Sequence, residues 1–234
     1  MEDYIVTGAS SGIGYATALA LTVKGHRVFA LARQKQSLEK LAAEAGKNGG
    51  TVVPVVMDLS DGNYTILEEA LNKANVSHLT GVLHNAGALI NKPFDKLELT
   101  DWQKVYGVNV FGVAMLTRFL LGRMGGVRNT HIVMISSIGG MGATVKYPGL
   151  SAYSSSKGAV LIMAECLAEE FRDRNIQVNC LALGSVQTEM LSAAFPGYKA
   201  PLLPGEIAEF ISGFCEWGWK FFNGKVVPVS LTNP

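Results

Sequence analysis

Short apolar runs alternate with longer amphipathic stretches along almost the whole chain. The short runs are rich in valine, isoleucine and leucine, as strands are, whereas the longer stretches have helical spacing. The pattern predicts strands at residues 4–7, 27–31, 51–57, 79–83, 131–136, 176–183 and 225–229. It predicts helices at residues 12–24, 35–45, 64–74, 100–124, 154–172 and 205–217.

The strand segments are nearly uniformly apolar instead of alternating with polar residues. A sheet covered by helices on both faces has this pattern, and right-handed helical crossovers keep its strands parallel. We therefore predict an α/β fold: a single-domain, doubly wound, Rossmann-like parallel sheet of seven strands with helices on both faces. No internal repeat or linker divides residues 1–234, so we expect one domain.

The composition of the chain argues against several classes of protein. The 234 residues, 48% of them hydrophobic and 17% charged, are enough for one large core. The 20 basic and 19 acidic residues form no run of either sign, so we expect no nucleic-acid partner. Three cysteines, Cys166, Cys180 and Cys215, have neither CxxC spacing nor a neighbouring histidine, so we expect no metal site and no disulfide framework.

The amino terminus, MEDYIVTGAS, has acidic residues where a signal peptide needs basic ones. No uninterrupted apolar run reaches the ~18 residues that a membrane-spanning helix needs. We therefore expect a soluble cytoplasmic protein that does not bind membranes.

Ligands of a doubly wound sheet bind outside the carboxyl ends of its strands. After the first predicted strand, TGASSGIG places Gly8, Gly12 and Gly14 directly before a helix. Such glycines let the backbone approach a pyrophosphate, and the helix amino terminus attracts its charge. The alternative is a simple glycine-rich turn. A Walker A loop is excluded because no Lys-Ser or Lys-Thr pair follows.

Basic residues follow the second predicted strand. An acid usually binds the ribose 2′-hydroxyl of NAD there, yet none occurs between His26 and Leu38. Arg33, and with it Lys35, suits a 2′-phosphate instead, because a guanidinium pairs with phosphate through two hydrogen bonds. A solvated basic turn is the alternative. This segment favours NADP(H) over NAD(H).

Single polar residues stand near the ends of later strands. Asp58 could cap the next helix or accept a hydrogen bond from an adenine amino group, and HNAG at 84–87 permits close backbone approach or a turn. Asn109 lies in a predicted helix among apolar neighbours, so we expect a buried amide with partners. Ser136 and Ser137 end the fifth strand, where turn chemistry could explain either.

Tyr153 and Lys157 are four residues apart in a helical segment, so their side chains share one face. A positive charge ~5 Å from a phenol favours the phenolate by ~3 kcal/mol, about two pKa units, at an effective dielectric constant near 20. Burial opposes this shift, and an oxidised nicotinamide would reinforce it. The pair therefore suits general acid/base chemistry, although a surface pair has the same spacing.

TGxxxGxG, NAG, the helical asparagine, the paired serines and YxxxK occur here in one order. Together they resemble the short-chain dehydrogenase/reductase family, in its short form, over essentially the whole chain. The resemblance implies an NAD(P)-dependent oxidoreductase that transfers hydride between NADPH and a ketone or aldehyde. It also implies a homodimer or homotetramer formed through the fourth and fifth helices, and a small carbonyl or alcohol substrate.

The resemblance also implies roles for individual residues. Tyr153 would be the general acid/base, and Lys157 would hold the nicotinamide ribose and lower the tyrosine pKa. Ser137, with Ser136 as the alternate, would bind the substrate oxygen, and Asn109 would order a water in a proton relay. The implied cofactor-binding residues are Gly8, Ser10, Ser11, Gly12, Ile13, Gly14, Arg33, Asp58, Leu59, Asn85, Ala86, Gly87, Tyr153, Lys157, Val186 and Thr188.

The chain departs from the family pattern at several positions. The segment 138–152 is longer than usual, so counting back from Tyr153 reaches Gly140, and we place the catalytic serine by its position at the strand end. Leu183 replaces a usual proline, which predicts a looser loop facing the nicotinamide, and His84 replaces an asparagine with little expected effect. The aromatic segment 215–224 predicts packing or a subunit interface.

A dinucleotide-binding sensor or scaffold without turnover is the alternative function, supported by Leu183 and the lengthened segment. The intact acid/base set is the argument against it. Substrate specificity is expected around residues 190–204, which are apolar and aromatic without a charged cluster. A 3-oxoacyl thioester, a sugar-derived ketone and a polycyclic ketone all remain open.

Overall fold

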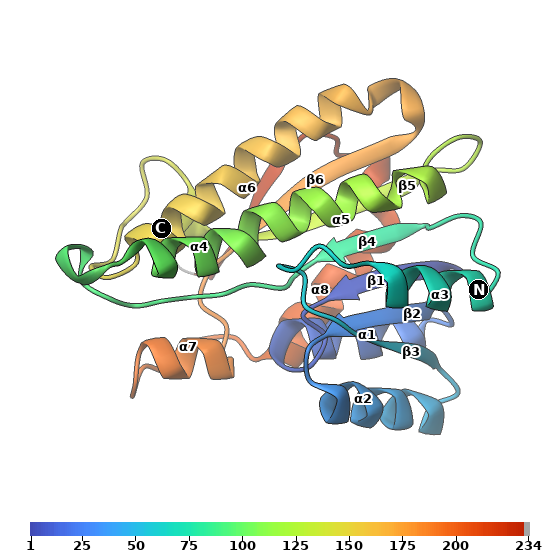
Figure 1. Cartoon of the computed structure of the whole chain (residues 1–234), viewed down its shortest axis with the longest axis horizontal. Coiled ribbons are helices and arrows are strands. Elements are labelled where there is room, and N and C mark those ends of the chain that lie inside the picture. The colour runs from blue at the N-terminus through green and yellow to red at the C-terminus, as the bar shows by residue number, and fades with distance from the viewer. Residues whose placement is uncertain (232–234) are drawn as a thin grey trace.

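Seven parallel strands form one sheet in the order β3-β2-β1-β4-β5-β6-β7 in the computed structural model, which describes residues 1–231 (Figure 1). The order reverses direction between β1 and β4, as in a doubly wound sheet, and the predicted fold is confirmed. The strands are β1 (Asp3–Thr7), β2 (Arg27–Ala32), β3 (Thr51–Val56), β4 (Gly81–His84), β5 (Thr130–Ser137), β6 (Ile176–Leu183) and β7 (Val226–Val229).

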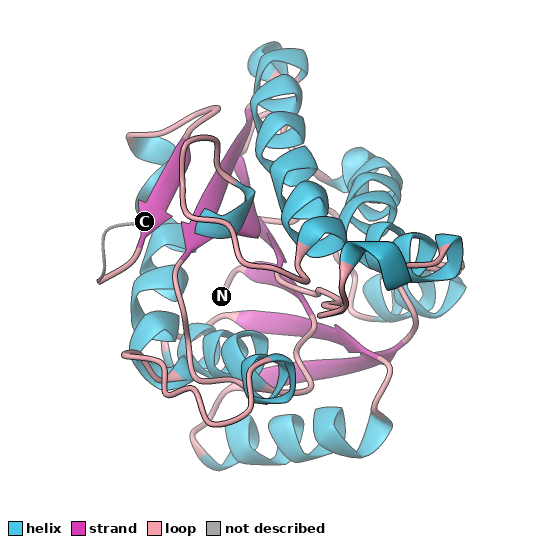
Figure 2. Cartoon of the chain, turned by 90° about the vertical axis from the view of Figure 1, so that its left-hand side faces the viewer, coloured by secondary structure: helices cyan, strands magenta, loops and turns pink. Residues whose placement is uncertain are grey.

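Helices cover both faces of the sheet, and a separate apolar core lies under each layer (Figures 1 and 2). Because both faces are buried, the strands are apolar at consecutive positions, as their sequence indicated. One layer contains α1 (Gly12–Val23), α2 (Lys35–Lys47) and α8 (Pro204–Trp217). The other contains α3 (Thr65–Lys73), α5 (Val113–Leu120) and α6 (Ser151–Glu170).

The helix predicted over residues 100–124 consists of several pieces. It comprises α4 (Leu99–Tyr106), a π-helical stretch η2 (Gly107–Gly112), α5 and a short 3₁₀ turn η3 (Leu121–Arg123). Asn109 lies inside the π-helical stretch, where glycines at both ends tolerate close approach. Gly112, for example, leaves only 3.1 Å between a Cβ and Leu59. Such π-helical insertions often mark functional sites, and periodicity in the sequence does not reveal them.

Two other helical features differ from the sequence prediction. α6 begins at Ser151, three residues before the predicted start, so Tyr153 lies in its first turn. α7 (Glu189–Ala194) was not predicted, because six residues are too few for a helical period to stand out. Thr188 caps α7, since its side chain accepts a hydrogen bond from the Leu191 N–H.

The stretch Leu99–Arg123 covers 25 residues and includes an 18-residue window with a mean hydropathy of 1.5, which is long and apolar enough to cross a membrane by length and composition alone. Charged and polar residues interrupt it, so a count of uninterrupted apolar residues does not find it. Val113, Leu116 and Leu120 are buried in the core under α5. A core helix of a globular protein has the same length and composition.

The structure shows what surrounds the positions that depart from the family pattern. Leu183 is buried and is the last residue of β6, hydrogen-bonded in register with β7, so the predicted loosening of the loop does not begin there. His84 is buried and contacts Thr117 at 2.9 Å, and burial lowers its pKa to about 4, so it is neutral. In the aromatic carboxyl-terminal region, Phe214 packs internally while Trp217 and Phe221 are exposed.

Candidate active site

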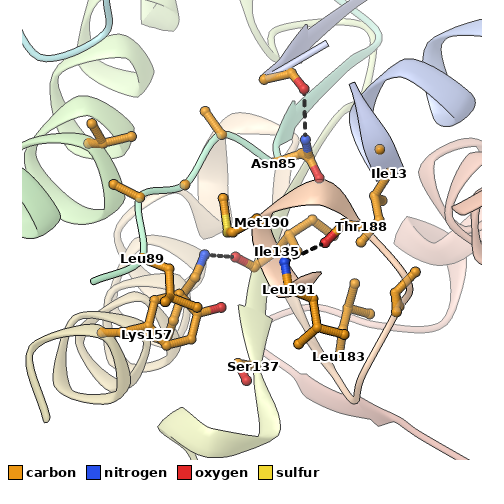
Figure 3. Close-up of a pocket in the computed structure, with 18 of the residues that line it drawn as sticks. Ile13, Asn85, Leu89, Ile135, Ser137, Lys157, Leu183, Thr188, Met190 and Leu191 are labelled. Atoms are coloured by element: carbon orange, nitrogen blue, oxygen red, sulfur yellow. Dashed lines mark hydrogen bonds between the residues drawn. The ribbon is translucent and has the colours of Figure 1, made fainter. Parts of the chain in front are cut away.

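A cleft of about 840 Å³ runs along the carboxyl ends of the strands, and Figure 3 shows part of its lining. The predicted residues that line it are Gly8, Ser10, Ser11, Gly12, Ile13, Arg33, Asp58, Leu59, Asn85, Ala86, Gly87, Ser136, Ser137, Tyr153, Lys157, Val186 and Thr188. Gly14 and Asn109, predicted for the same site, lie behind the cleft wall. No group of three or more histidine, cysteine or acidic side chains gathers within residues 1–231.

The glycine-rich loop after β1 turns sharply into α1. Gly8 and Gly12 have φ values of +66° and +57°, which residues other than glycine rarely adopt. A Cβ on Gly8 would lie 2.7 Å from the backbone of Ala86. Because the loop ends at the amino terminus of α1 and faces the cleft, its geometry fits a bound pyrophosphate.

Gly14 has a packing role at the base of the glycine-rich loop. A Cβ at this position would lie 2.4 Å from the Asn85 side-chain nitrogen and 2.4 Å from the Gly8 carbonyl oxygen. The bare backbone therefore allows α1 to pack directly against the ends of β1 and β4. A glycine is needed for this close approach, but its atoms do not line the cleft.

Thr7, which the sequence prediction omitted, ties the ends of β1 and β4 together. Its hydroxyl oxygen accepts hydrogen bonds from the N–H groups of Asn85 and Ala86, both at 3.0 Å. The Asn85 side chain donates in return to the Thr7 carbonyl at 3.0 Å. The threonine that precedes the glycines was visible in the sequence, but only the paired strands showed what it contacts.

Arg33 and Asp58 lie together at the end of the cleft formed by β2 and β3. Their side chains approach to 3.6 Å, and that of Arg33 is 72% exposed. Asp58 caps no helix, because α3 begins only at Thr65; it accepts two hydrogen bonds from Ser60. Burial raises the pKa of Asp58, but the Ser60 hydrogen bonds and the Arg33 charge hold it below the ordinary value.

The two serines at the end of β5 have different partners. The Ser136 hydroxyl is buried and donates to the Lys157 main-chain carbonyl at 2.8 Å. The Ser137 hydroxyl accepts from the Gly139 N–H at 3.1 Å and lies close enough to Tyr153 to act on the pKa of its phenol. Ser137, placed by its position at the strand end, is therefore the serine beside the phenol.

Tyr153 and Lys157 both line the cleft from the first two turns of α6. The lysine nitrogen lies 5.9 Å from the centre of the tyrosine ring and donates to the Ile135 carbonyl at 2.8 Å (Figure 3). Only 4% of Lys157 is exposed. This convergence of phenol and ammonium in one cleft is what the four-residue spacing predicted.

The protonation of the pair follows from its burial. Burial raises the pKa of Tyr153 to about 12, although the neighbouring Ser137 side chain acts in the opposite direction. Burial lowers the pKa of Lys157 to about 8. Burial, the effect expected to oppose a lowered tyrosine pKa, therefore sets the direction of both shifts in this structure. At pH 7 the phenol keeps its proton and the lysine keeps its charge.

Asn109 is 1% exposed and its amide is bound by protein groups. Its oxygen accepts from the Ala88 N–H at 2.7 Å, and its nitrogen donates to the Ala88 carbonyl and the Ser156 hydroxyl. The predicted burial is correct, but the side chain joins the loop after β4 to α6 and does not face the cleft. It positions the wall from which Lys157 projects.

The segment after β6 returns to the glycine-rich loop. A Cβ on Gly12 would lie 3.2 Å from the Thr188 methyl group, and the Thr188 hydroxyl caps α7 through Leu191 (Figure 3). Val186 is buried and bridges to Leu202. Both predicted residues thus lie at the junction between the glycine-rich loop and the segment that carries α7.

Apolar side chains beyond Tyr153 complete the cleft, and most of them were not predicted. They come from the loop after β4, the lengthened segment after β5 and the region of α7. The sequence indicated only the last of these regions, since the lengthened segment has no helical or strand period. They are Leu89, Ile138, Val145, Tyr147, Leu150, Met190, Leu191, Phe195 and Tyr198.

Comparisons with known proteins agree with this geometry. The family model described as short chain dehydrogenase matches residues 3–199. The 3-oxoacyl-(acyl-carrier-protein) reductase FabG of Thermotoga maritima is 33% identical over 80% of this chain and 74% of its own length. Oxidoreductase BOA17 of Botryotinia fuckeliana is 30% identical over 98% of this chain and 81% of its own.

Solved structures give the same result for the fold. The crystal structure of 3-ketoacyl-(acyl-carrier-protein) reductase from Brucella melitensis, complexed with NADH, superimposes with a TM-score of 0.86 and 26% identity. The alignment covers 98% of this chain and 96% of that one.

Proposed function

The chain belongs to the short-chain dehydrogenase family, an oxidoreductase family acting on CH–OH and C=O groups, and on that premise we propose that it is an NADPH-dependent carbonyl reductase with Tyr153 as general acid. The observation that carries this proposal is the cluster of Ser137, Tyr153 and Lys157 in the cleft. Bound nicotinamide supplies the hydride in reduction or accepts it in oxidation. The protein's own residues supply the binding and the proton.

Tyr153 and Ser137 act together on the substrate oxygen. Both side chains line the cleft next to each other, so an oxygen placed between them receives a hydrogen bond from each hydroxyl. As negative charge develops on that oxygen, Tyr153 transfers its proton, and the neighbouring Lys157 ammonium stabilises the phenolate that results. A tyrosine with a pKa of about 12 is fully protonated at pH 7, which suits the reductive direction.

Other residues of the cleft bind the dinucleotide in this proposal. The backbone of Ser10, Ser11 and Gly12 holds the pyrophosphate, while Lys157 holds the nicotinamide ribose. Ile13, Leu59, the 85–87 backbone, Val186 and Thr188 line the remaining length of the cleft.

We propose NADPH in preference to NADH because of Arg33. Its guanidinium lies at the cleft end formed by β2, largely exposed and beside Asp58, where it could pair with a 2′-phosphate. The Brucella relative was crystallised with NADH, so the preference of this chain rests on its own residue 33.

We further propose a soluble cytoplasmic homodimer or homotetramer whose single domain spans residues 1–234. Leu99, Phe111 and Met115, on the helices α4 to α5, are exposed, and Ile162 on the neighbouring α6 is exposed as well. A second copy covering this face would bury these side chains. The same contact accounts for the apolar composition of the stretch 99–123 without a membrane.

The two sequence features that supported a sensor or scaffold without turnover have structural roles in the described part of the chain. Leu183 is a buried residue of β6 that also lines the cleft. The other support, the lengthened segment, contributes side chains to the cleft and leaves Tyr153 beside Ser137.

The test follows NADPH absorbance while ketones and aldehydes are supplied, with Tyr153→Phe as the matched variant. We expect turnover by the wild type and a loss of about 10²- to 10⁴-fold in kcat for Tyr153→Phe, because only the transferable proton is removed. NADPH affinity, measured by fluorescence titration, should remain the same in both. NADPH binding without oxidation by any carbonyl compound, or full activity of Tyr153→Phe, would contradict the proposal.

A further inference from the structure

Three segments that are distant in the sequence meet beyond Tyr153, at the catalytic end of the cleft. They are the loop after β4 with Leu89, the lengthened segment 138–150 with Tyr147, and the α7 region with Phe195. Leu89, Met190 and Leu191 line the same cleft as Lys157, as Figure 3 shows. A substrate whose oxygen contacts Tyr153 must therefore place its carbon skeleton among these segments.

The side chains at this end are apolar or aromatic. Val145, Tyr147 and Tyr198 are exposed, so a ligand that covers them removes apolar surface from water. Lys146 does not line the cleft, and its ammonium donates hydrogen bonds to the Met141 carbonyl and to two oxygens of Thr144. A charged substituent next to the substrate carbonyl would lose water here without gaining a partner.

Apart from Lys157, which belongs to the acid/base set, the charged side chains in this part of the cleft are solvent-exposed, among the residues that the structure describes. Lys104 and Glu189 line the cleft and are both solvent-exposed. They can meet a distant polar group, but not the atoms next to the carbonyl. The arrangement thus favours a hydrocarbon group near the reacting carbon and disfavours a carboxylate or a hydroxyl-rich sugar there.

Hydrogen bonds between the three segments hold this wall in place. The Asn91 side chain donates to the Ala194 carbonyl at 2.8 Å, and the Lys92 N–H donates to the Gly149 carbonyl at 3.0 Å. Gly149 has a φ of +85°, and a Cβ there would lie 2.0 Å from the Asn91 side-chain oxygen. The lengthened segment therefore packs closely against the loop after β4 and is hydrogen-bonded to it.

Tyr147 and Phe195 form the outermost contact of the wall. Their ring centres are 6.4 Å apart and their planes meet at 66°, an edge-to-face arrangement. Tyr147 comes from the lengthened segment and Phe195 from the end of α7, so their contact closes the space between two loops. We call this pair the 147–195 clasp.

We propose that the 147–195 clasp is a specificity-determining element that selects carbonyl compounds bearing an uncharged hydrocarbon group and limits the length of that group. The inference rests on the proposed function, since it assumes that the reacting carbonyl lies at Tyr153. It gives a role to the lengthened segment, which the acid/base mechanism does not use. Each methylene buried before the clasp should raise kcat/KM about fourfold, and methylenes beyond it should add little.

The test uses unbranched methyl ketones of increasing chain length, and a keto acid with its methyl ester. Steady-state kcat/KM with NADPH is measured for the wild type, Tyr147→Ala, Tyr147→Phe and Phe221→Ala. Tyr147→Phe keeps the ring, and Phe221→Ala removes an exposed aromatic side chain that does not line the cleft. Dissociation constants of the same compounds with the enzyme–NADP⁺ complex are measured by calorimetry, which does not depend on turnover.

We expect kcat/KM and affinity to rise with chain length up to a certain length and then to level off; we call that length the break. Tyr147→Ala should move the break to longer chains. Tyr147→Phe and Phe221→Ala should keep the wild-type break. The ester should exceed the keto acid by about a hundredfold, because the acid carries a charge into an apolar site. A break that is unchanged in Tyr147→Ala, or a keto acid equal to its ester, overturns the inference.

Failure of the inference can be distinguished from failure of the proposed function. Turnover with a chain-length profile that Tyr147→Ala leaves unchanged would contradict only the inference. Ketone binding without turnover would contradict the proposed function, while the calorimetric profile would still confirm or overturn the selectivity. Absence of any ketone binding would overturn both.

Discussion

The two halves of the cleft are built in different ways. In the cofactor half, the side chains of Thr7 and Asn85 hydrogen-bond to main-chain groups at the ends of β1 and β4, and there is no space for an added atom on Gly14. In the substrate half, Tyr147 and Phe195 meet edge to face, and a side-chain hydrogen bond from Asn91 joins the loop after β4 to α7. A change in the first half should damage the fold, whereas a change in the second should alter selectivity.

Gly14→Ala should have the largest effect. The added methyl group would lie 2.4 Å from a main-chain oxygen, so β1 or α1 must move, and we expect a loss of about 3 kcal/mol in the free energy of unfolding. NADPH binding should weaken with it. Urea denaturation measures the first effect and fluorescence titration the second.

Gly46→Ala in α2 is the matched control for that substitution. Nothing lies within 4 Å of its Cβ position, so the alanine should gain up to about 1 kcal/mol from helix propensity. If Gly14→Ala were as harmless as this control, the close packing assigned to the cofactor half would be wrong.

Lys157 connects the two halves and should make stability depend on pH. Burial lowers its folded pKa to about 8 from the ordinary 10.5, so between these values the unfolded chain binds the proton and the folded chain does not. Stability contributed by this group therefore rises with pH across that window, by about 3 kcal/mol in all. Lys157→Met has no titratable group at this position. We expect it to have a higher unfolding free energy than the wild type at pH 7, and this difference should shrink accordingly by pH 10.

The same group sets the expected pH profile of reduction. Below pH 8, Lys157 is charged and Tyr153 protonated, so kcat/KM with free enzyme should be flat. Above pH 8 the ammonium is lost, and kcat/KM should fall about tenfold per pH unit. A profile that stayed flat to pH 10 would show that the lysine charge is not needed.

Thr7→Val tests the hydrogen bonds of the cofactor half. Valine has a similar shape but leaves the N–H groups of Asn85 and Ala86 without their acceptor. We expect a loss of about 2 kcal/mol in unfolding free energy, together with weaker NADPH binding. Thr7→Ser keeps the oxygen and should recover most of the loss; a serine variant as poor as valine would point to packing instead of hydrogen bonding.

These contrasts explain what the sequence could predict. Gly8, Gly12, Tyr153 and Lys157 act through local backbone freedom or a four-residue helical spacing, so their places in the cleft followed from short motifs. The contacts of Gly14, Thr7 and Asn109 required the structure, because their partners come from other strands or helices. The extent to which burial raises the Tyr153 pKa also required the structure, because burial depends on the whole surrounding fold.

The substrate half was the least predictable part for the same reason. Tyr147 and Phe195 belong to segments without strand or helical periodicity, and α7 is too short to produce one. Their contact depends on how two loops pack across the cleft. No local pattern indicates which of several exposed aromatic residues will meet.

Arg33→Ala should act at the far end of the cofactor half and leave the fold intact. Arg33 is largely exposed, and 3.6 Å from Asp58 it forms only a weak ion pair, so unfolding free energy should barely change. NADPH affinity should fall about tenfold, with little change for NADH, because only NADPH has the phosphate that the guanidinium binds. Equal losses for both dinucleotides would remove the basis for the NADPH preference.

Asn91→Ala should have the smallest effect on stability and is the sharpest test of the difference between the two halves. It removes the hydrogen bond to Ala194 from an exposed site, so we expect a loss of at most about 1 kcal/mol in unfolding free energy. Asn63→Ala, which removes one exposed hydrogen bond at the start of α3, should cost a similar amount. Only Asn91→Ala should raise KM for ketones, and neither should change the dissociation constant for NADPH. If Asn91→Ala weakened NADPH binding as strongly as Thr7→Val, the wall that contacts substrate and the loop that contacts cofactor would be one cooperative unit, and selectivity could not be altered without damaging the dinucleotide site.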